Sequence, residues 1–381
     1  MGRSGSFIQT NEKHSYKYFA PASLPPNPEL NMNELSNTLA DATEALGRLN
    51  MLSELIPDMS IFLYQYVRKE AVLSSQIEGT QATLEDILDP EIAENTEKLA
   101  DVEEIVNYIA ATNYALERQK KLPLSNRFLR EIHEKLMSGV RGQEKNPGEF
   151  RHSQNWIGPQ GSTIATAKYV PPTVEKMDNA LNDLEKYIHS ADTLHPLIQA
   201  ALIHYQFETI HPFLDGNGRV GRLLIILFLL EKKVIQAPIL YISLELKRNQ
   251  YEYYDRMMAV RNTGNYEQWV KFFLEVVTHA AKNATNKINQ LSKLIESDRK
   301  KIADEHYKSS TVKNIYEFLL SQPLVTVNGL AKYFDLGFAT INNAIKQLET
   351  LGIVIQTSRG KRNRVFSYKE YLTILEDDTL V

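Results

Sequence analysis

The 381-residue chain contains no cysteine. It therefore forms no disulfide, no thiolate metal site and no cysteine nucleophile, and this absence suits a reducing compartment. Long apolar runs are missing too. A membrane span needs ~18–20 apolar residues, whereas the best candidate, Val220 to Leu230, is shorter and carries Arg222. The opening residues, MGRSGSFIQT, lack the apolar core of a signal peptide, and we expect a soluble, cytoplasmic protein.

A large excess of basic charge is also missing. The chain has 43 Lys and Arg against 47 Asp and Glu, a net charge of −4. This balance argues against a protein that binds nucleic acid over its whole surface, but it leaves a local basic patch open. With 43% hydrophobic residues the chain is long enough for two or three domains with sizeable cores.

Helical spacing of apolar residues dominates the chain. Residues 1–30 are polar and proline-bearing, which predicts an extended arm without a core of its own. Apolar residues recur at helical spacing over 32–116, and Ser125–Met137 and Val174–Ile188 are amphipathic in the same way. The pattern resumes from Pro196 to about Leu294. We therefore predict a mainly α fold.

One segment departs from this pattern. Gln154–Lys168 is rich in β-branched and aromatic residues around the sequence GPQG. This composition predicts a β-hairpin or flap between two helical regions.

The stretch HPFLDGNGRVGR, His211–Arg222, crowds polar and basic groups against the start of an apolar run. Pro196 suits the first turn of a helix that ends near Ile210. Pro212 then restrains His211 from helical geometry, so the imidazole is set at a bend. His211 is the group in this stretch that can readily accept a proton near neutral pH.

The second half of the stretch has the features of an anion site. Gly216 and Gly218 allow a tight turn and a close approach of the backbone to a ligand. The next helix is expected to begin near Gly218 or Arg219, with its free N–H groups facing the loop. Arg219 and Arg222, three apart, project from one face as a two-pronged polyphosphate clamp. Asp215 adds an oxygen ligand suited to Mg²⁺.

Simpler explanations of this stretch exist. A histidine before a proline is often structural, and Asp-Gly-Asn-Gly is often only a turn. Two arginines in a first helical turn oppose the helix dipole, however, and require an anionic partner. A zinc site from His204 and His211 does not match known ligand spacings, and no Walker-type Gly-Lys-Ser/Thr follows. Phosphate binding is therefore the favoured interpretation.

The stretch resembles the motif of the Fic family, HPFx(D/E)GNGRxxR, at all nine of its specified positions. The likeness extends over about residues 120–280, with GEFR and the flap before the motif and LYISLELKRNQYEYYDRM after it. It implies a mainly α-helical core with a β-hairpin flap. It also implies a nucleotidyltransferase that moves AMP from ATP to a Tyr, Thr or Ser hydroxyl of a target protein. A Fic fold with a different donor, such as a phosphotransferase, is an alternative.

The resemblance also implies a role for each residue of the site. His211 would be the base, Asp215 would hold Mg²⁺ on the phosphates, and the flap would register the target by adding a strand beside it. The residues it assigns to ATP binding are Asp215, Gly216, Asn217, Gly218, Arg219, Val220, Gly221, Arg222, Tyr253 and Tyr254. Among these, Gly216, Asn217 and Gly218 form the anion hole, and the two tyrosines line the adenine pocket, although packing alone would also justify them.

A second stretch, SSQIEGT, lies far upstream. By itself it is an ordinary helix end, with Gly79 stopping the helix. Beside the catalytic motif, Ser74, Glu78 and Gly79 resemble the inhibitory pattern (S/T)xxxE(G/N) of Fic proteins. The resemblance implies that Glu78 pairs with Arg222 and occupies the place of the ATP γ-phosphate. Whether Glu78 also supports removal of AMP from targets is left open.

The C-terminal piece resembles a winged helix. Val327–Phe334 and Phe338–Leu351 predict a helix-turn-helix pair, and Ile353–Gln356 and Val365–Tyr368 flank a basic tip with Arg359, Lys361, Arg362 and Arg364. As a DNA reader its second helix would offer Thr340, Asn342, Asn343 and Lys346. Winged helices also serve in protein contacts. A DNA-binding regulator with a Fic-like sensor body is therefore the alternative function.

These patterns divide the chain into four expected parts. They are an N-terminal arm and helical region with the inhibitory helix (1–118), a Fic catalytic domain (119–280), a helical linker (281–308) and a winged-helix domain (309–381). Self-modification and a homodimer are partner states that the sequence leaves open.

Overall fold

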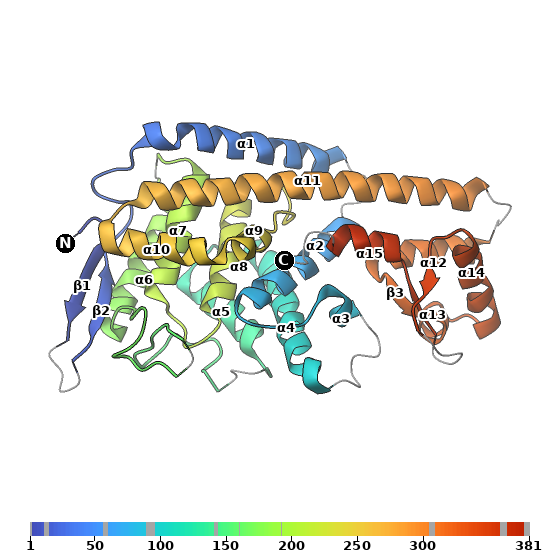
Figure 1. Ribbon diagram of the computed structural model, residues 1–381, viewed down its shortest axis with the longest axis horizontal. Coiled ribbons are helices and arrows are strands. Elements are labelled where there is room, and N and C mark those ends of the chain that lie inside the picture. The colour runs from blue at the N-terminus through green and yellow to red at the C-terminus, as the bar shows by residue number, and fades with distance from the viewer. Residues whose placement is uncertain are drawn as a thin grey trace.

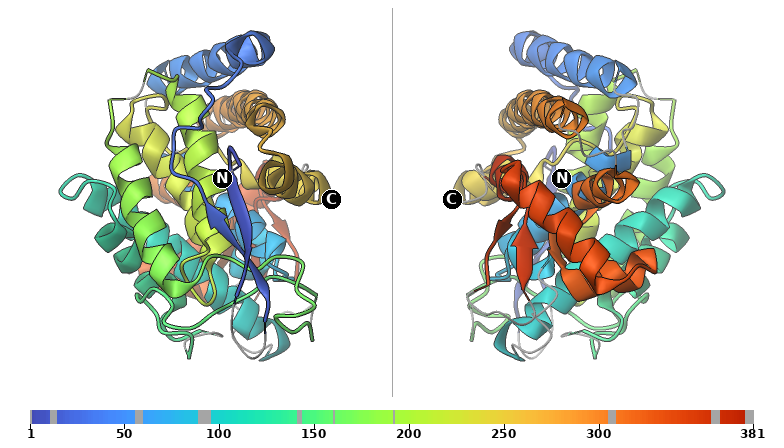
Figure 2. Two further views of the ribbon diagram at one scale, coloured as in Figure 1. Left: turned by 90° about the vertical axis from the view of Figure 1, so that its left-hand side faces the viewer. Right: turned by 90° about the vertical axis from the view of Figure 1, so that its right-hand side faces the viewer.

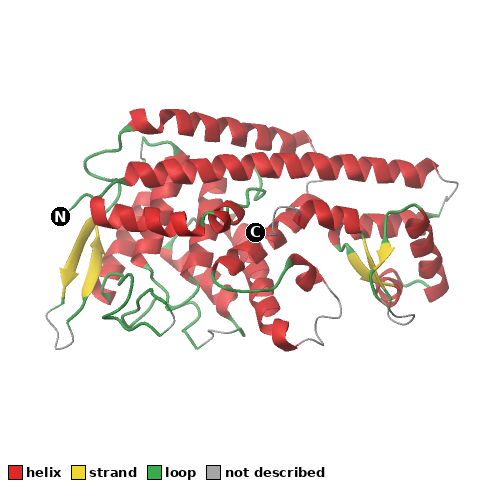
Figure 3. Ribbon diagram, viewed as in Figure 1, coloured by secondary structure: helices red, strands yellow, loops and turns green. Residues whose placement is uncertain are grey.

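The structure is a computed structural model, and it describes residues 2–10, 15–55, 60–88, 96–140, 144–159, 161–191, 193–304, 309–358 and 364–376. Helices form most of it, as predicted (Figure 3). Up to the catalytic stretch they are α1 (Met32–Leu55), α2 (Ser60–Ile77), α3 (Leu84–Leu88), α4 (Thr96–Gln119), α5 (Asn126–Met137), α6 (Val174–Ile188) and α7 (Pro196–Ile210). After it come α8 (Asn217–Glu231), α9 (Ser243–Arg248), α10 (Gln250–Thr263), α11 (Tyr266–Asp304), α12 (Ser310–Ser321), α13 (Val327–Phe334), α14 (Phe338–Thr350) and α15 (Lys369–Glu376). Within the described residues, no helix combines the length and apolar character that crossing a membrane requires.

The helix α11 connects the two ends of the molecule. Its 39 residues extend over about 58 Å at 1.5 Å per residue, and α1 lies along it (Figure 1). A buried stripe that includes Trp269, Phe273 and Val277 faces the core. The C-terminal elements gather at the far end of α11 (Figure 1). The expected boundary at residue 280 falls inside this continuous helix.

The helices α7 and α8 form the centre of the core. Every residue of α7 from Leu197 to Ile210 is buried, as are most residues of α8. Helices that are apolar all round are typical of a fully enclosed position, and here α4, α5, α6 and α11 pack around the pair. The loop that joins α7 to α8 is therefore held at both ends by buried helices.

The N-terminal segment differs from its prediction. The strands β1 (Gly5–Gln9) and β2 (Lys17–Pro21) form an antiparallel hairpin rather than an extended arm. Phe19 is fully buried, and its amide donates to the Val170 carbonyl at 2.9 Å. The expectation of an extended arm was wrong, because the two strands pair with each other and Phe19 bonds to Val170, a contact between distant parts of the chain.

The C-terminal region contains the predicted helix pair, α13 and α14, and a three-stranded antiparallel sheet (Figure 2, right). The sheet order is β3-β5-β4, with β3 at Leu324–Thr326, β4 at Ile355–Gln356 and β5 at Val365–Ser367. Of the basic tip, Arg359, Lys361 and Arg362 lie outside the described residues. The identification of this region as a winged helix stays a prediction.

Candidate active site

The predicted base lies at the bend between α7 and α8. His211 ends α7 with a left-handed backbone, φ 51° and ψ 61°, a conformation that costs a non-glycine residue about 1–2 kcal/mol. Its carbonyl oxygen accepts hydrogen bonds from Arg151 Nε at 3.1 Å and from Asn155 Nδ2 at 3.3 Å. These bonds stabilise the bend, and the imidazole lines a cleft of about 640 Å³.

The imidazole of His211 is neutral. Burial, followed by the positive charges of Arg151 and Arg261, lowers its pKa to about 3. At neutral pH it is therefore a proton acceptor, the state that a general base needs before it acts.

The side chain of Asn217 locks the loop. Its Oδ1 accepts from the amide of Phe213 at 2.8 Å, and its Nδ2 donates to the carbonyl of the same residue at 2.8 Å. Gly216, with φ 75°, then caps α8, which begins at Asn217, slightly earlier than expected. The amide group of Asn217 is thus used within the protein. Any contribution of this residue to an anion hole comes from its backbone N–H in the first turn of α8.

A histidine that the sequence did not single out supports the same loop. His133 accepts from the amide of Gly148 at its Nδ1 (2.9 Å), so its Nε2 donates to the carbonyl of Asp215 (3.0 Å). The ring stacks on Phe213 with centroids 3.8 Å apart. Burial lowers the pKa of His133 to about 4, so this tautomer is neutral. The Asp215 side chain itself is about half exposed and lines the cleft.

The two arginines of the predicted clamp have different surroundings. Arg222 lines the cleft and is 1% exposed. Arg219 points to another side, where its Nη1 lies 3.5 Å from Glu104 Oε2 and its Nη2 lies 3.6 Å from Asp215 Oδ1. In this structure Arg222 is the arginine of the pair placed for a ligand in the cleft, and phosphate binding by Arg219 stays a prediction.

The Glu78 carboxylate lies over the first turn of α8. Its Oε1 accepts from Arg222 Nη2 at 2.8 Å. A Cβ at Gly218 would collide with the same oxygen, so the carboxylate sits directly on the glycine backbone. An acidic group at a helix N-terminus beside a buried arginine occupies the position that an anionic ligand would take.

The rest of the SSQIEGT stretch holds this arrangement. Arg222 Nε donates to Ser74 Oγ and its Nη2 to the Ser74 carbonyl, both at 2.8 Å. Gly79 follows with φ 104°, a conformation that favours glycine. Gln250 Nε2 donates to the carbonyl of Ile77, the last residue of α2, at 3.0 Å. The structure thus brings together the two stretches that the sequence analysis selected.

Both predicted adenine-pocket tyrosines line the cleft. Tyr253 is buried and its hydroxyl donates to His204 Nε2 at 2.8 Å, while His204 Nδ1 donates to the Gly221 carbonyl at 3.1 Å. Burial lowers the pKa of His204 to about 3, which keeps this imidazole neutral. Burial also raises the pKa of Tyr254 to about 12. The packing interpretation of Tyr253 and the ligand interpretation are both compatible with this geometry.

A buried carboxyl group was missed by the sequence analysis. Glu208, one turn before His211, lines the cleft. A Cβ at Gly221 would collide with its Oε1, which explains a glycine at that position. Burial raises the pKa of Glu208 to about 7, against the opposing charge of Arg222. The neighbouring Val220 is buried in the core beneath the loop.

The flap over the cleft is less regular than predicted. Instead of a β-hairpin, Gln154–Lys168 forms a loop closed by one antiparallel bridge, Ile157 to Tyr169, with hydrogen bonds of 2.8 and 3.0 Å. Pro159 and the glycines beside it interrupt strand pairing, and Trp156 Nε1 instead donates to the Ser162 carbonyl. Gln160 lies outside the described residues. Ile157 and Trp156 are exposed beside the cleft.

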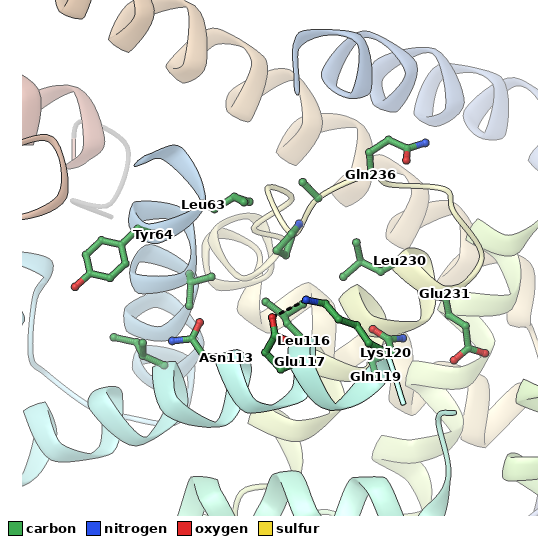
Figure 4. Close-up of a pocket in the computed structure, with 14 residues that line it drawn as sticks. Leu63, Tyr64, Asn113, Leu116, Glu117, Gln119, Lys120, Leu230, Glu231 and Gln236 are labelled. Carbon is green, nitrogen blue, oxygen red and sulfur yellow. Dashed lines mark hydrogen bonds and ion pairs between the residues drawn. The ribbon is translucent and has the colours of Figure 1, made fainter. Parts of the chain in front are cut away.

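A second cleft, of about 760 Å³, lies between α2, α4 and the end of α8 (Figure 4). Its walls include Leu63, Leu116 and Leu230, and the ion pair within it joins Lys120 to Glu117 at 2.6 Å. No predicted site residue lines it. This cleft is larger than the one beside His211, whereas the grouping of a base, an arginine and a helix N-terminus favours the His211 cleft as the functional site.

Comparison with known proteins gives the following matches. Residues 36–117 match the profile described as Fic/DOC family N-terminal, and residues 123–229 match the one described as Fic/DOC family. The protein adenylyltransferase Fic of Drosophila melanogaster is 26% identical over 297 residues, which cover 72% of this chain and 56% of the relative. The protein of the same name from Drosophila yakuba is 27% identical with the same coverage. The chain spans little more than half the length of these relatives.

Two solved structures share the fold. A Fic family protein from Desulfovibrio desulfuricans G20 aligns with a TM-score of 0.56 at 21% identity, over 89% of this chain and 97% of the other. A Fic domain containing signaling protein from Bacteroides thetaiotaomicron aligns with a TM-score of 0.51 at 20% identity, over 65% of this chain and 98% of the other.

Proposed function

Residues 36–117 and 123–229 belong to the Fic/DOC family, and on that premise we propose that the chain is a protein adenylyltransferase. It transfers AMP from ATP to a Tyr, Thr or Ser hydroxyl of a target protein. The observation that carries the proposal is the grouping of a neutral His211, a buried Arg222 and the N-terminus of α8 around one cleft. The names of the curated relatives support the same activity.

The chemistry proceeds in line at the α-phosphorus. His211 accepts the proton of the target hydroxyl through its Nε2 while the hydroxyl oxygen forms a bond to that phosphorus. The bond from the α-phosphorus to the bridging oxygen breaks, and pyrophosphate leaves. Backbone N–H groups of Asn217 and Gly218, at the positive end of α8, face the charge that develops on the phosphate oxygens, whereas the Gly216 N–H donates to Asp215 Oδ1 at 2.5 Å in this structure. Because these donors are fixed before the reaction, they need no reorganisation during it.

The residues of the cleft suit Mg²⁺ bound together with ATP. Mg²⁺ usually takes one or two carboxylates plus phosphate oxygens and water, and Asp215 offers one accessible carboxylate beside the cleft. Among the described residues, no group of three or more His, Asp or Glu side chains forms a metal cage, which fits an ion held mainly by the nucleotide. When bound, it would neutralise charge on the leaving pyrophosphate.

Autoinhibition by Glu78 is part of the proposal. The ion pair between Glu78 and Arg222 supports it, because the guanidinium engaged there is the one that would bind the γ-phosphate. ATP then binds with its α-phosphate out of line. Removal of AMP from targets, self-modification, a homodimer and a cytoplasmic location stay predictions.

A DNA-binding regulator is the alternative. Thr340, Asn343 and Lys346 are exposed on α14, as a DNA reader would require, and Asn342 Oδ1 accepts a hydrogen bond from Arg364. Against this, Tyr333 and Phe338 expose apolar rings at the turn between α13 and α14, a feature more typical of a protein contact.

One experiment distinguishes adenylyl transfer from the DNA-binding alternative. Wild type, Glu78→Gly and the double variant Glu78→Gly/His211→Ala receive Mg²⁺ and ATP labelled at either the α- or the γ-phosphate, with cell lysate as a source of targets. We expect α label on protein, more in Glu78→Gly and at least ~100-fold less in the double variant, since general base catalysis contributes about 10²–10⁴. Transfer of γ label would indicate a phosphotransferase. Absence of any label would overturn the proposal and favour the DNA-binding alternative.

A further inference from the structure

The carboxyl group of Glu208 lies behind the catalytic histidine. Its Oε2 is 4.0 Å from His211 Nδ1, on the same face of α7 one turn earlier. Both residues line the cleft. Glu208 therefore approaches the imidazole from the Nδ1 side, opposite the Nε2 that would take the proton.

Among the described residues, two atoms of this pair lack a partner that meets full hydrogen-bond geometry, although the Glu208 backbone also favours the charged form of His211. Within the described part of the chain, Glu208 Oε1 and His211 Nδ1 are buried atoms without a hydrogen-bond partner. An unpaired buried carboxyl group is costly, and such groups are retained in proteins mainly where they have a role. The helix geometry also reserves space for it, since the absence of a Cβ at Gly221 leaves room for Oε1.

We propose that Glu208 is a positioning residue that supplies the negative counter-charge to the imidazolium formed when His211 takes the proton of the target hydroxyl. The inference rests on the proposed adenylyl transfer. Arg151 and Arg261 both disfavour a positive charge on His211, so the imidazolium needs a nearby anion. The Glu208 carboxylate, 4.0 Å from Nδ1, lies within reach of that charge.

The surroundings of Glu208 set its protonation. Arg222 on α8 and Arg261 on α10 favour the carboxylate, whereas Glu78 at the end of α2 disfavours it. Tyr253 and Tyr254 on α10 face the same space. The net effect of burial and these charges is a pKa raised from 4.5 to about 7. The carboxylate is therefore present above this pH and lost below it.

This arrangement makes a specific prediction for the pH dependence. In wild type, kcat/KM for α-label transfer rises as pH increases through about 7, the pKa of Glu208. In a Glu78→Gly background the rise shifts to lower pH, because one carboxylate that raises the Glu208 pKa is gone. With Glu208→Gln the rise disappears between pH 5.5 and 8, since His211 alone titrates near 3.

The test compares Glu208→Gln with Glu70→Gln, both in the Glu78→Gly background. Glu70 is the matched control because burial raises its pKa to about 7 as well, but it hydrogen-bonds to Ser243 and does not line the cleft. We expect Glu208→Gln to lower kcat at pH 8 by at least ~10-fold, to leave the KM for ATP unchanged and to remove the acid limb. Glu70→Gln keeps the limb. A Glu208→Gln profile parallel to the parent profile would overturn the inference.

A second readout needs no activity. In protein labelled with ¹⁵N-histidine, the His211 ring signals, identified by their loss in His211→Ala, should change between pH 6 and 8 in the parent and stay constant in Glu208→Gln. Constant signals in both proteins, or equal changes in both, would contradict the coupling. If the parent transfers no α label, the adenylyltransferase proposal fails while this spectroscopic test still decides whether the pair is coupled.

Discussion

The catalytic loop and the segment that opposes it are held in different ways. The loop is fixed within the protein on every side: Asn217 binds the Phe213 backbone twice, His133 binds the Asp215 carbonyl, and the helices at both ends are buried. Glu78 instead follows the end of α2, with a side chain 36% exposed. Its carboxylate reaches the loop through Arg222.

The catalytic loop is therefore a fixed part of the protein, whereas the Glu78 carboxylate can be displaced. A buried network of hydrogen bonds is costly to disturb, whereas the partly exposed Glu78 carboxylate can be exchanged for another anion at Arg222. The base and the anion-binding helix end can therefore stay in place while the carboxylate above them leaves. Displacement of Glu78 would make Arg222 available to a ligand and leave the structure of the loop unchanged.

Removal of the Asn217 side chain, which holds the catalytic loop, should have the largest effect on stability and activity. Asn217→Ala leaves the Phe213 amide unsatisfied in the core, so we expect the free energy of unfolding to fall by about 1–3 kcal/mol. Transfer of α label by Glu78→Gly should fall at least ~100-fold when this change is added, because the backbone donors lose their positions. Urea unfolding and label transfer measure the two effects. Asn37→Ala, at an exposed position of α1, is the control, and equal losses in both variants would contradict the anchoring role.

Removal of the Glu78 carboxylate should raise the transfer activity. Glu78→Gly should raise α-label transfer by about 10-fold or more, which corresponds to ~1.4 kcal/mol of lost competition for Arg222. The free energy of unfolding should fall by about 1–3 kcal/mol, because the buried Arg222 guanidinium loses one of its hydrogen-bond acceptors. Glu78→Gln keeps the shape of the side chain and loses its charge, so its α-label transfer should lie between that of wild type and that of Glu78→Gly. Unchanged transfer in both variants would show that Glu78 is only a helix end.

The smallest effect is expected at the adenine pocket. Tyr253→Phe removes the hydrogen bond to His204 and keeps the ring, so stability should fall by about 1 kcal/mol while transfer stays within a factor of about 2. Thermal unfolding and steady-state kinetics at varied ATP provide the measurement. A raised KM for ATP without a loss of stability would instead assign the hydroxyl to the nucleotide.

Local signals explain which features could be predicted from the sequence. Pro196, Pro212 and Gly216 determine where α7 ends and α8 begins, and each acts through its own backbone geometry. Ser74 and Glu78 were found because a motif pairs them with Arg222. The roles of His133 and Glu208 depend on contacts with residues that the sequence alone does not bring near. His133 lies on the apolar face of α5, where a histidine is more often a core residue than a loop support.

The N-terminal hairpin shows the same limit. Its strands are five residues each, and the surface that buries Phe19 comes from Tyr169 and Val170, far along the chain. For the flap, in contrast, a hairpin was predicted and does not form. Its β-branched residues favour a strand, but Pro159 and its glycines prevent a continuous ladder. In the hairpin long-range packing overrides local preference, whereas in the flap one local signal overrides another.

Nucleotide affinities test most directly whether Glu78 and the γ-phosphate compete for Arg222. The Kd values of ATP and ADP are measured by calorimetry with Mg²⁺ for wild type and Glu78→Gly. Wild type should bind the two nucleotides about equally, because the third phosphate finds its arginine engaged, and Glu78→Gly should prefer ATP by about 10-fold, or ~1.4 kcal/mol. The same ATP-to-ADP ratio in both proteins would contradict the account.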